Sequence, residues 1–219
     1  MGLFYTENKK ISHDIARCTH FIFISYFLYM TSCFKGIPSG IILLGISFSR
    51  MRILKTGEKE DSMSRKKEIA LYLISILIAL AVGGISAFIN RSGMELFETT
   101  TVKPILTPPG FVFSIVWTIL YALMGFSAAR FYCKADSTRK SGLWIYFLQL
   151  FFNFLWTILF FSFQQYLFSF IWLLILILLV FLMIAAFHQV DKKAAFLQFP
   201  YLIWLLFAAY LNLGVVLLN

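Results

Sequence analysis

The sequence predicts an all-α integral membrane protein built as a bundle of five transmembrane helices. Of its 219 residues, 60% are hydrophobic and only 13% are charged, and so few charges do not make a water-soluble surface. Between Arg65 and Asn219 the 16 charged residues are separated by long apolar stretches. Each stretch is roughly 20 residues, the length of helix that crosses ~30 Å of hydrocarbon.

Five apolar spans follow residue 63, and each must be helical because a lipid environment leaves backbone groups no other partners. The connection from Asn90 to Pro108 contains a glycine, a run of three consecutive threonines and prolines, which predicts an irregular loop of the kind that often forms a lid. The predicted spans are Ile69–Ile89, Pro109–Tyr132, Leu143–Phe163, Leu167–Phe187 and Ala194–Leu218.

The net charge of +9 is explained by membrane orientation and not by nucleic-acid binding, because the basic residues stand between apolar spans. Nine of them fall on one predicted side, while Arg91 and Lys103 on the other side are offset by Glu95 and Glu98. Basic residues favour the cytoplasmic side. We therefore expect the first span to start in the cytoplasm and Asn219 to lie outside.

Residues 1–62 form an atypical N-terminal extension to the predicted membrane domain at 63–219. Their apolar run, Phe21–Phe34, is 14 residues long and ends at Lys35. This run fits neither of two interpretations well. It lacks the small-residue cleavage site of a signal-like segment, and it is short for a sixth transmembrane helix. We favour a third hypothesis, in which the natural chain starts at Met63, because Lys59–Met63 can be encoded with a bacterial ribosome-binding sequence before ATG. This favours a bacterial plasma membrane.

The sequence predicts no metal site and no ordinary catalytic group. No nucleophile, acid–base pair or metal cluster supports hydrolytic or metal catalysis. The metal-capable side chains in the extension match no common zinc spacing and have a hydrophobic context; they are His13, Cys18, His20 and Cys33.

Neutral polar residues mark an inward face on the third span. Gln149 and Asn153 are one helical turn apart, and Trp156 is on the adjoining position. Buried amides are costly unless they are paired. They either tie helices together or contact a ligand, and both interpretations predict an inward face.

Aromatic and small residues recur every four positions on two other spans. Phe113, Trp117 and Tyr121 form one stripe, and Trp204 and Ala208 belong to the other. Such stripes are often only packing. However, three helices that each offer a tryptophan beside small or polar residues can line a flat, mostly apolar cavity. A further ridge of small residues, Ala79, Gly83 and Ala87, permits close helix approach within the chain or between two copies.

Three of these segments resemble the translocator protein family (TspO/MBR, tryptophan-rich sensory proteins), in order and spacing over residues 67–219. The matching residues are Pro108–Phe113 with Trp117–Gly125, then Gln149, Leu150, Asn153, Trp156, Phe160 and Phe161, and finally Pro200–Trp204 with Phe207, Ala208, Leu211 and Asn212. Phe97 stands where the family usually has tryptophan, and Leu106 replaces another common aromatic residue.

The resemblance implies a five-helix bundle, commonly a homodimer, that binds porphyrins such as protoporphyrin IX as ligands and requires no cofactor. By position, its pocket would be lined by Trp117, Tyr121, Asn153, Trp156, Trp204 and Ala208, with the loop 90–107 as a roof. Sterol binding is not expected, because no basic residue follows Tyr201 or Tyr210.

The leading functional hypothesis is therefore the sensing or translocation of porphyrin-like hydrophobic ligands. The ring would stack between tryptophan and tyrosine side chains, with amide contacts from Asn153 and Gln149, and Arg91 or Lys103 would meet the carboxylates at the polar mouth. One alternative is a light-dependent enzyme that degrades porphyrin with Trp117 and Trp204 as electron donors. Another is a membrane scaffold without a small-molecule ligand.

Overall fold

The computed structural model describes residues 64–136 and 142–219. The chain divides into two units, Met1–Met63 and Ser64–Asn219, and only the second is described below. The expectations for the N-terminal extension, for a start at Met63 and for the histidines and cysteines of that segment lie outside the described residues.

Five helical segments in the described part of the chain are long and apolar enough to cross a membrane, which confirms the predicted fold class. They comprise α2 (Arg65–Ile89), α4 (Gly110–Lys134), α5 with the π-helix η2 (Gly142–Thr157 and Ile158–Ser162), α6 (Tyr166–His188), and α7 with α8 (Lys192–Phe196 and Phe199–Leu218). One further helix, α3 (Arg91–Thr100), joins α2 to α4. At 1.5 Å per residue the 25 residues of α2 span about 37 Å.

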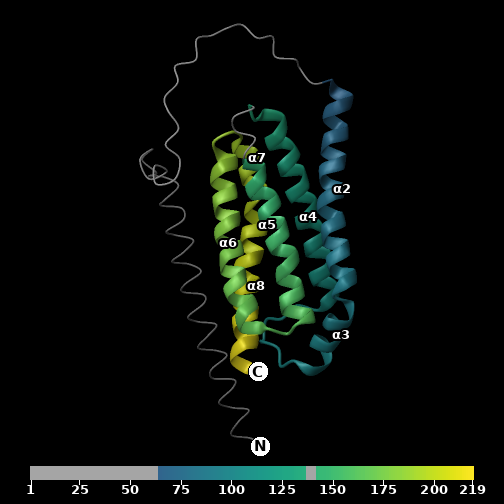
Figure 1. The fold of residues 1–219 in the computed structure, drawn as a ribbon, viewed down its shortest axis with the longest axis vertical. Coiled ribbons are helices and arrows are strands. Elements are labelled where there is room, and N and C mark those ends of the chain that lie inside the picture. Colours follow the sequence, from purple (N-terminus) through teal and green to yellow (C-terminus); the bar gives the residue numbers. More distant parts are fainter. Residues whose placement is uncertain (1–63, 137–141) are drawn as a thin grey trace, which may run out of the picture. The chain divides into compact units, whose positions relative to one another are not determined.

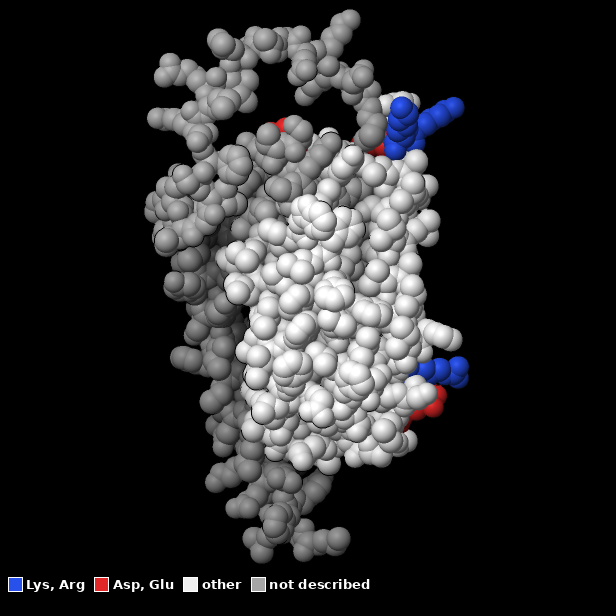
Figure 2. All heavy atoms as spheres, viewed as in Figure 1, with Lys and Arg blue, Asp and Glu red and all other residues white. Residues whose placement is uncertain are grey.

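Successive long helices run in opposite directions, so the bundle has two distinct ends (Figure 1). We call one the basic end, because the start of α2, the end of α4 and the start of α7 bring basic residues there. The other is the α3 end, where α3 and Asn219 lie. On the described part of the face shown in Figure 2, the surface between the two ends is almost free of charge, as lipid contact requires. The basic end holds, among described residues, Arg65, Lys66, Lys67, Arg130, Lys134, Lys192 and Lys193.

Close approach of α2 and α4 depends on glycine. A Cβ atom on Gly125 would lie 2.6 Å from the Ile76 Cα, and one on Gly83 would collide with the Tyr121 ring. The predicted small-residue ridge thus packs within the chain at Ala79, which is fully buried, and at Gly83. Small residues at such crossings let helix backbones approach in lipid.

The segment 90–108 is not wholly irregular, so that prediction was wrong for residues 91–100, which form α3. Gly93 and the two threonines of α3 lower helix propensity, but tertiary packing outweighs it. A Cβ atom at Gly93 would lie 2.5 Å from the Phe161 carbonyl oxygen, so only glycine allows α3 to lie against η2. Phe97 anchors the same helix, with its ring 5.2 Å from that of Phe160.

The last predicted span, Ala194–Leu218, lies within the candidate membrane span Lys192–Leu218, but this span is not one uninterrupted helix. α7 ends at Phe196, and a turn precedes α8, which starts at Phe199. Pro200 lies in the first turn of α8. Proline suits that position because it has no N–H to donate, and inside a continuous helix it would break the hydrogen-bond ladder.

A buried carboxylate fixes the short helix α7 at the basic end. Asp191 is 7% exposed. One oxygen caps α7 by accepting from the Lys193 N–H at 3.0 Å, and the other lies 2.6 Å from the Arg130 Nε and 3.2 Å from the Lys134 Nζ. Burial alone would raise the pKa of Asp191, but the Lys193 N–H, the Lys134 hydrogen bond and the Arg130 charge together hold this pKa below its usual value.

The crossing of α2 and α4 gives a first prediction. We expect Gly125→Ala to destabilise the protein by about 1–3 kcal/mol, because the added methyl group meets backbone that cannot move aside. Thermal unfolding in detergent measures this change. Gly84→Ala on the same pair of helices is the matched control, because a Cβ atom there has nothing within 4 Å. Equal stability of the two variants would contradict the close crossing.

A second prediction concerns pH. Asp191→Asn keeps an oxygen to cap α7 but removes the charge, so we expect a loss of about 1–3 kcal/mol at pH 7. Because the folded pKa of Asp191 is lowered, its charge stabilises the fold above the unfolded pKa of ~3.9, and this contribution disappears as pH falls through the folded pKa. The gap in unfolding temperature between wild type and variant should therefore close in acid.

The control for this pH dependence is Glu95→Gln, which removes one partner of the exposed Arg91–Glu95 pair. Exposed pairs contribute about 0–1 kcal/mol, so this variant should unfold close to wild type at neutral pH. A wild type–Asp191→Asn gap that is unchanged between pH 7 and pH 3 would show that the charge of Asp191 does not stabilise the fold.

Candidate functional site

A cavity of about 720 Å³ lies between α2, α4, α5 and α8 toward the α3 end. This volume is in the range of small-molecule sites. Its walls are mostly aromatic and apolar, and its polar residues gather on α3 and beside it. Five of the eight predicted site residues line it: Phe113, Trp117, Tyr121, Trp156 and Ala208.

The aromatic rings on the wall hold one another in place. The ring centroids of Trp117 and Tyr121 are 5.6 Å apart, and those of Trp156 and Phe160 are 5.5 Å apart and nearly parallel. Ring pairs at such distances attract each other beyond their buried area. Trp156 is 2% exposed, so its ring is held in place by packing against its neighbours.

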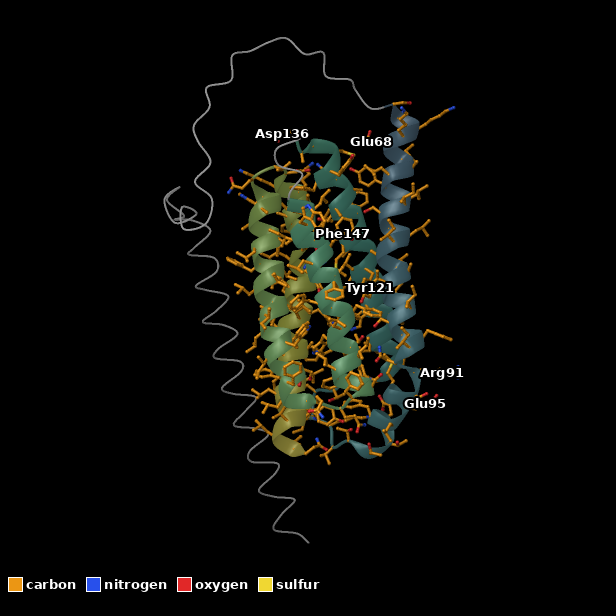
Figure 3. All side chains as sticks on the ribbon, viewed as in Figure 1. Glu68, Arg91, Glu95, Tyr121, Asp136 and Phe147 are labelled. Carbon is orange, nitrogen blue, oxygen red and sulfur yellow. The ribbon has the colours of Figure 1, made fainter. Side chains whose placement is uncertain are left out.

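Asn153 does not line the cavity but supports it from behind. The Tyr121 hydroxyl donates to the Asn153 Oδ1 at 2.7 Å, and the Asn153 Nδ2 donates to the Tyr201 hydroxyl at 2.9 Å. The amide is fully buried. It therefore joins α4, α5 and α8 and fixes the Tyr121 ring, which Figure 3 shows inside the bundle, away from Arg91 and Glu95 at the α3 end.

The other two predicted residues also lie outside the cavity wall. Gln149 is fully buried, one turn from Asn153, with its Nε2 3.8 Å from the Met124 sulfur. Trp204 packs its ring edge-on against Phe113, with centroids 5.3 Å apart. The Gln149 Oε1 and the Trp204 indole N–H are buried and have no hydrogen-bond partner among the described residues.

The roof of the cavity is α3. Arg91, Met94, Glu95, Phe97, Glu98 and Thr99 line the cavity from this helix, so the segment that the sequence identified as a roof does cover it. Lys103 does not line the cavity, because its ammonium group pairs with Glu98 and lies over the Phe97 ring, 5.6 Å from its centroid. Arg91 and Lys103 were the two cations expected at the mouth of the cavity, and of these Arg91 lines the cavity wall.

A polar cluster attaches the roof to the bundle. The Asn90 Nδ2 donates to the Ser86 carbonyl at 2.8 Å and to the Thr157 hydroxyl at 3.1 Å. The Ser162 hydroxyl donates to the Asn90 Oδ1 at 2.7 Å. Sequence reading missed Asn90, although a polar residue directly after a 25-residue apolar helix was the available signal.

The far end of the connection is also tied down. The Asn219 side chain accepts from the Val102 N–H at 3.0 Å and donates to the Val102 carbonyl at 3.1 Å. The Thr101 and Tyr166 hydroxyls lie 3.0 Å apart. Since both ends of α3 are held, the roof has a defined position over the cavity.

The bridge between the two tyrosines gives a third prediction. Asn153→Leu leaves both hydroxyls buried without this partner, and we expect a loss of about 2–4 kcal/mol in unfolding free energy. Adding Tyr201→Phe to Asn153→Leu should recover part of the loss, since it removes one orphaned hydroxyl. A double-mutant cycle by thermal unfolding measures the coupling. Strict additivity would show that the amide does not couple α5 to α8.

Comparison with known proteins matches residues 74–218 to the TspO/MBR family. The tryptophan-rich protein TspO of Chlorobaculum tepidum is 33% identical over 157 residues, 70% of this chain and 98% of the relative. The TspO of Archaeoglobus fulgidus is 37% identical over 148 residues, 66% of this chain and 94% of that protein. The translocator protein of Bos taurus is 34% identical over 113 residues, half of this chain and 67% of the relative. The chain is an integral membrane protein of the TspO/MBR family.

Proposed function

We propose that this protein binds a planar, largely apolar ligand of the porphyrin type, such as protoporphyrin IX, and serves in its sensing or translocation. The observation that carries this proposal is the cavity of about 720 Å³, whose walls are aromatic and whose charged residues are confined to the roof. A flat conjugated ring can stack on Trp117, Tyr121 and Trp156 without displacing a buried charge.

The roof supports a ligand with an acidic edge. Burying a carboxylate is costly, so the propionate groups of a porphyrin would stay at the α3 end, where Arg91 is on the wall. The Arg91 Nε lies 3.6 Å from the Glu95 Oε1, and both side chains are more than two-thirds exposed. Such a pair is weak, which leaves Arg91 available to a ligand carboxylate.

The side of the cavity supports arrival from the bilayer. Gly84 and Ala87 on α2, and Ser114 and Thr118 on α4, line the cavity and are exposed. All four belong to helices that can cross the membrane. An apolar ligand dissolved in lipid therefore has a lateral route into the cavity between α2 and α4.

The relatives support a sensory or translocator role. The one from Cereibacter sphaeroides is named a tryptophan-rich sensory protein and is 38% identical over 117 residues, and the one from Bos taurus is named a translocator protein. We place the present protein in a bacterial plasma membrane with its basic end in the cytoplasm. That end carries seven basic and three acidic described residues, the acids being Glu68, Asp136 and Asp191, and positive charge favours the cytoplasmic side.

The fourth prediction tests the ligand. We expect detergent-purified full-length protein to bind protoporphyrin IX saturably, and Trp117→Ala to weaken binding roughly tenfold, since a lost ring contact of ~1.4 kcal/mol corresponds to that factor. The absorbance band and fluorescence of the porphyrin report binding directly. Trp144→Ala is the matched control, because Trp144 is 78% exposed and does not line the cavity.

A second pair of titrations tests the acidic edge. Arg91→Gln should weaken binding of protoporphyrin IX but not of its dimethyl ester, which has no carboxylate to pair. If the folded wild type shows no saturation with either compound, the porphyrin proposal fails. Equal affinities of wild type, Trp117→Ala and Trp144→Ala would place the bound porphyrin outside the cavity.

A further inference from the structure

A second hollow, separate from the cavity, lies at the basic end between α4 and α7. It is a groove of about 520 Å³ lined by Phe126 and Arg130 of α4, by Lys192, Lys193 and Phe196 of α7, and by Leu197. None of the acidic residues in the described part of the chain lines it. It faces outward from the bundle, since Lys192, Lys193 and Phe196 are all exposed.

The two walls of the groove repeat one arrangement. On α4, Phe126 precedes Arg130 by four residues, and α4 runs toward the basic end. On α7, Lys192 precedes Phe196 by four residues, and α7 starts at the basic end and runs away from it. Four residues are one turn, about 6 Å along the helix. Each wall therefore places a cation near the end of the bundle and a phenylalanine one turn deeper.

The aromatic side chains of the groove are exposed to the bilayer. Phe196 is 73% exposed and Phe126 is 39% exposed. An exposed ring one turn deeper than a lysine lies where acyl chains begin, because lysine side chains reach the headgroup region. The deeper part of the groove therefore suits a hydrocarbon chain.

Two of the three cations of the groove, Lys192 and Lys193, are not neutralised by the described residues, whereas Arg130 is paired with Asp191. Asp191 is engaged by both Arg130 and Lys134, so one negative charge faces two positive ones. Lys192 and Lys193 form no ion pair within residues 64–136 and 142–219. The ionic contacts of Asp191 and the hydrogen bond from the Ser127 hydroxyl to the Ala194 carbonyl, 2.7 Å, hold α7 against α4. The groove is thus a fixed shape with an unbalanced positive end.

We propose that this groove binds one anionic phospholipid, with the phosphate between Lys192, Lys193 and Arg130 and an acyl chain along Phe126 and Phe196. A free phosphate ester would have no use for the exposed rings, and a zwitterionic lipid would bring its own positive charge to three cations. An anionic phospholipid matches both parts of the groove, because its phosphate suits the cations and its acyl chain suits the exposed rings. Basic pockets beside transmembrane helices at the cytoplasmic side bind such headgroups.

The test compares two lipids that differ only in the headgroup. Native mass spectrometry of the full-length protein in detergent, titrated with dioleoyl phosphatidylglycerol or dioleoyl phosphatidylcholine, gives the affinity of the first bound lipid. We expect the anionic lipid to bind roughly 10- to 30-fold more tightly, because each lysine near the surface contributes about a fivefold preference. The double variant Lys192→Gln/Lys193→Gln should lose this preference.

The matched control is Lys66→Gln/Lys67→Gln, which removes the same charge from the same end of the bundle but not from the groove. It should keep the preference. Equal loss in both double variants would mean diffuse attraction to the basic end and would overturn the site, as would an unchanged preference in Lys192→Gln/Lys193→Gln. Circular dichroism checks that each variant is folded.

Two further arms test the acyl chain. Phe196→Gln should weaken both lipids alike, and since this side chain is largely exposed the fold should not suffer. Glycerol 1-phosphate at millimolar concentration should not displace the bound lipid. Displacement by this headgroup analogue, or full affinity in Phe196→Gln, would show a site for soluble phosphate esters and overturn the lipid proposal.

Discussion

The arrangement of the bundle depends on one buried amide. Asn153 is fully buried in α5 and bridges the hydroxyls of Tyr121 and Tyr201, so it joins α5 to α4 and α8. In hydrocarbon an unpaired amide is costly, and the observed registration of the three helices pairs all three polar groups. The same bond directs the Tyr121 ring toward α2, where Gly83 leaves room for it. The inner end of the cavity is therefore a consequence of how the helices are joined.

The opposite end of the cavity follows from a second polar cluster and a local change of helix. Asn90 joins the end of α2 to Thr157 and Ser162 of the α5–η2 segment. Between these two partners the chain forms the π-helix Ile158–Ser162, a distortion that is frequent at functional sites. It places Phe160 and Phe161 in the cavity wall and brings the Phe161 carbonyl against Gly93. The roof and the wall are in this way held by the same few residues.

The sequence predicts the five spans and their alternating direction, because the apolar stretches have the length of membrane-spanning helices. It also predicts the inward faces of α4, α5 and α8, because aromatic, small and polar residues recur there every four positions. The helix α3 could not be predicted, since Gly93 and two threonines disfavour a helix that is stabilised by contacts with η2. Periodicity also did not distinguish a residue on the cavity wall from one behind it. Asn153, Gln149 and Trp204 face inward as expected, but they pack against Tyr121, Met124 and Phe113, and those partners lie on another helix far away in sequence.

The two ends of the bundle differ in their balance of positive and negative charge. At the α3 end Arg91 is beside Glu95 and Lys103 is beside Glu98, so the described charges there balance and attract no ion strongly from a distance. For the ligand proposed above, selection would then depend on the shape and aromatic character of the cavity, with Arg91 adding one local contact. At the basic end, seven basic residues face three acidic ones. Such an excess acts over about a Debye length, which suits it to the charged surface of a membrane. Under the proposed function, the α3 end would recognise a ligand by fit, and the basic end would orient the protein through its charge.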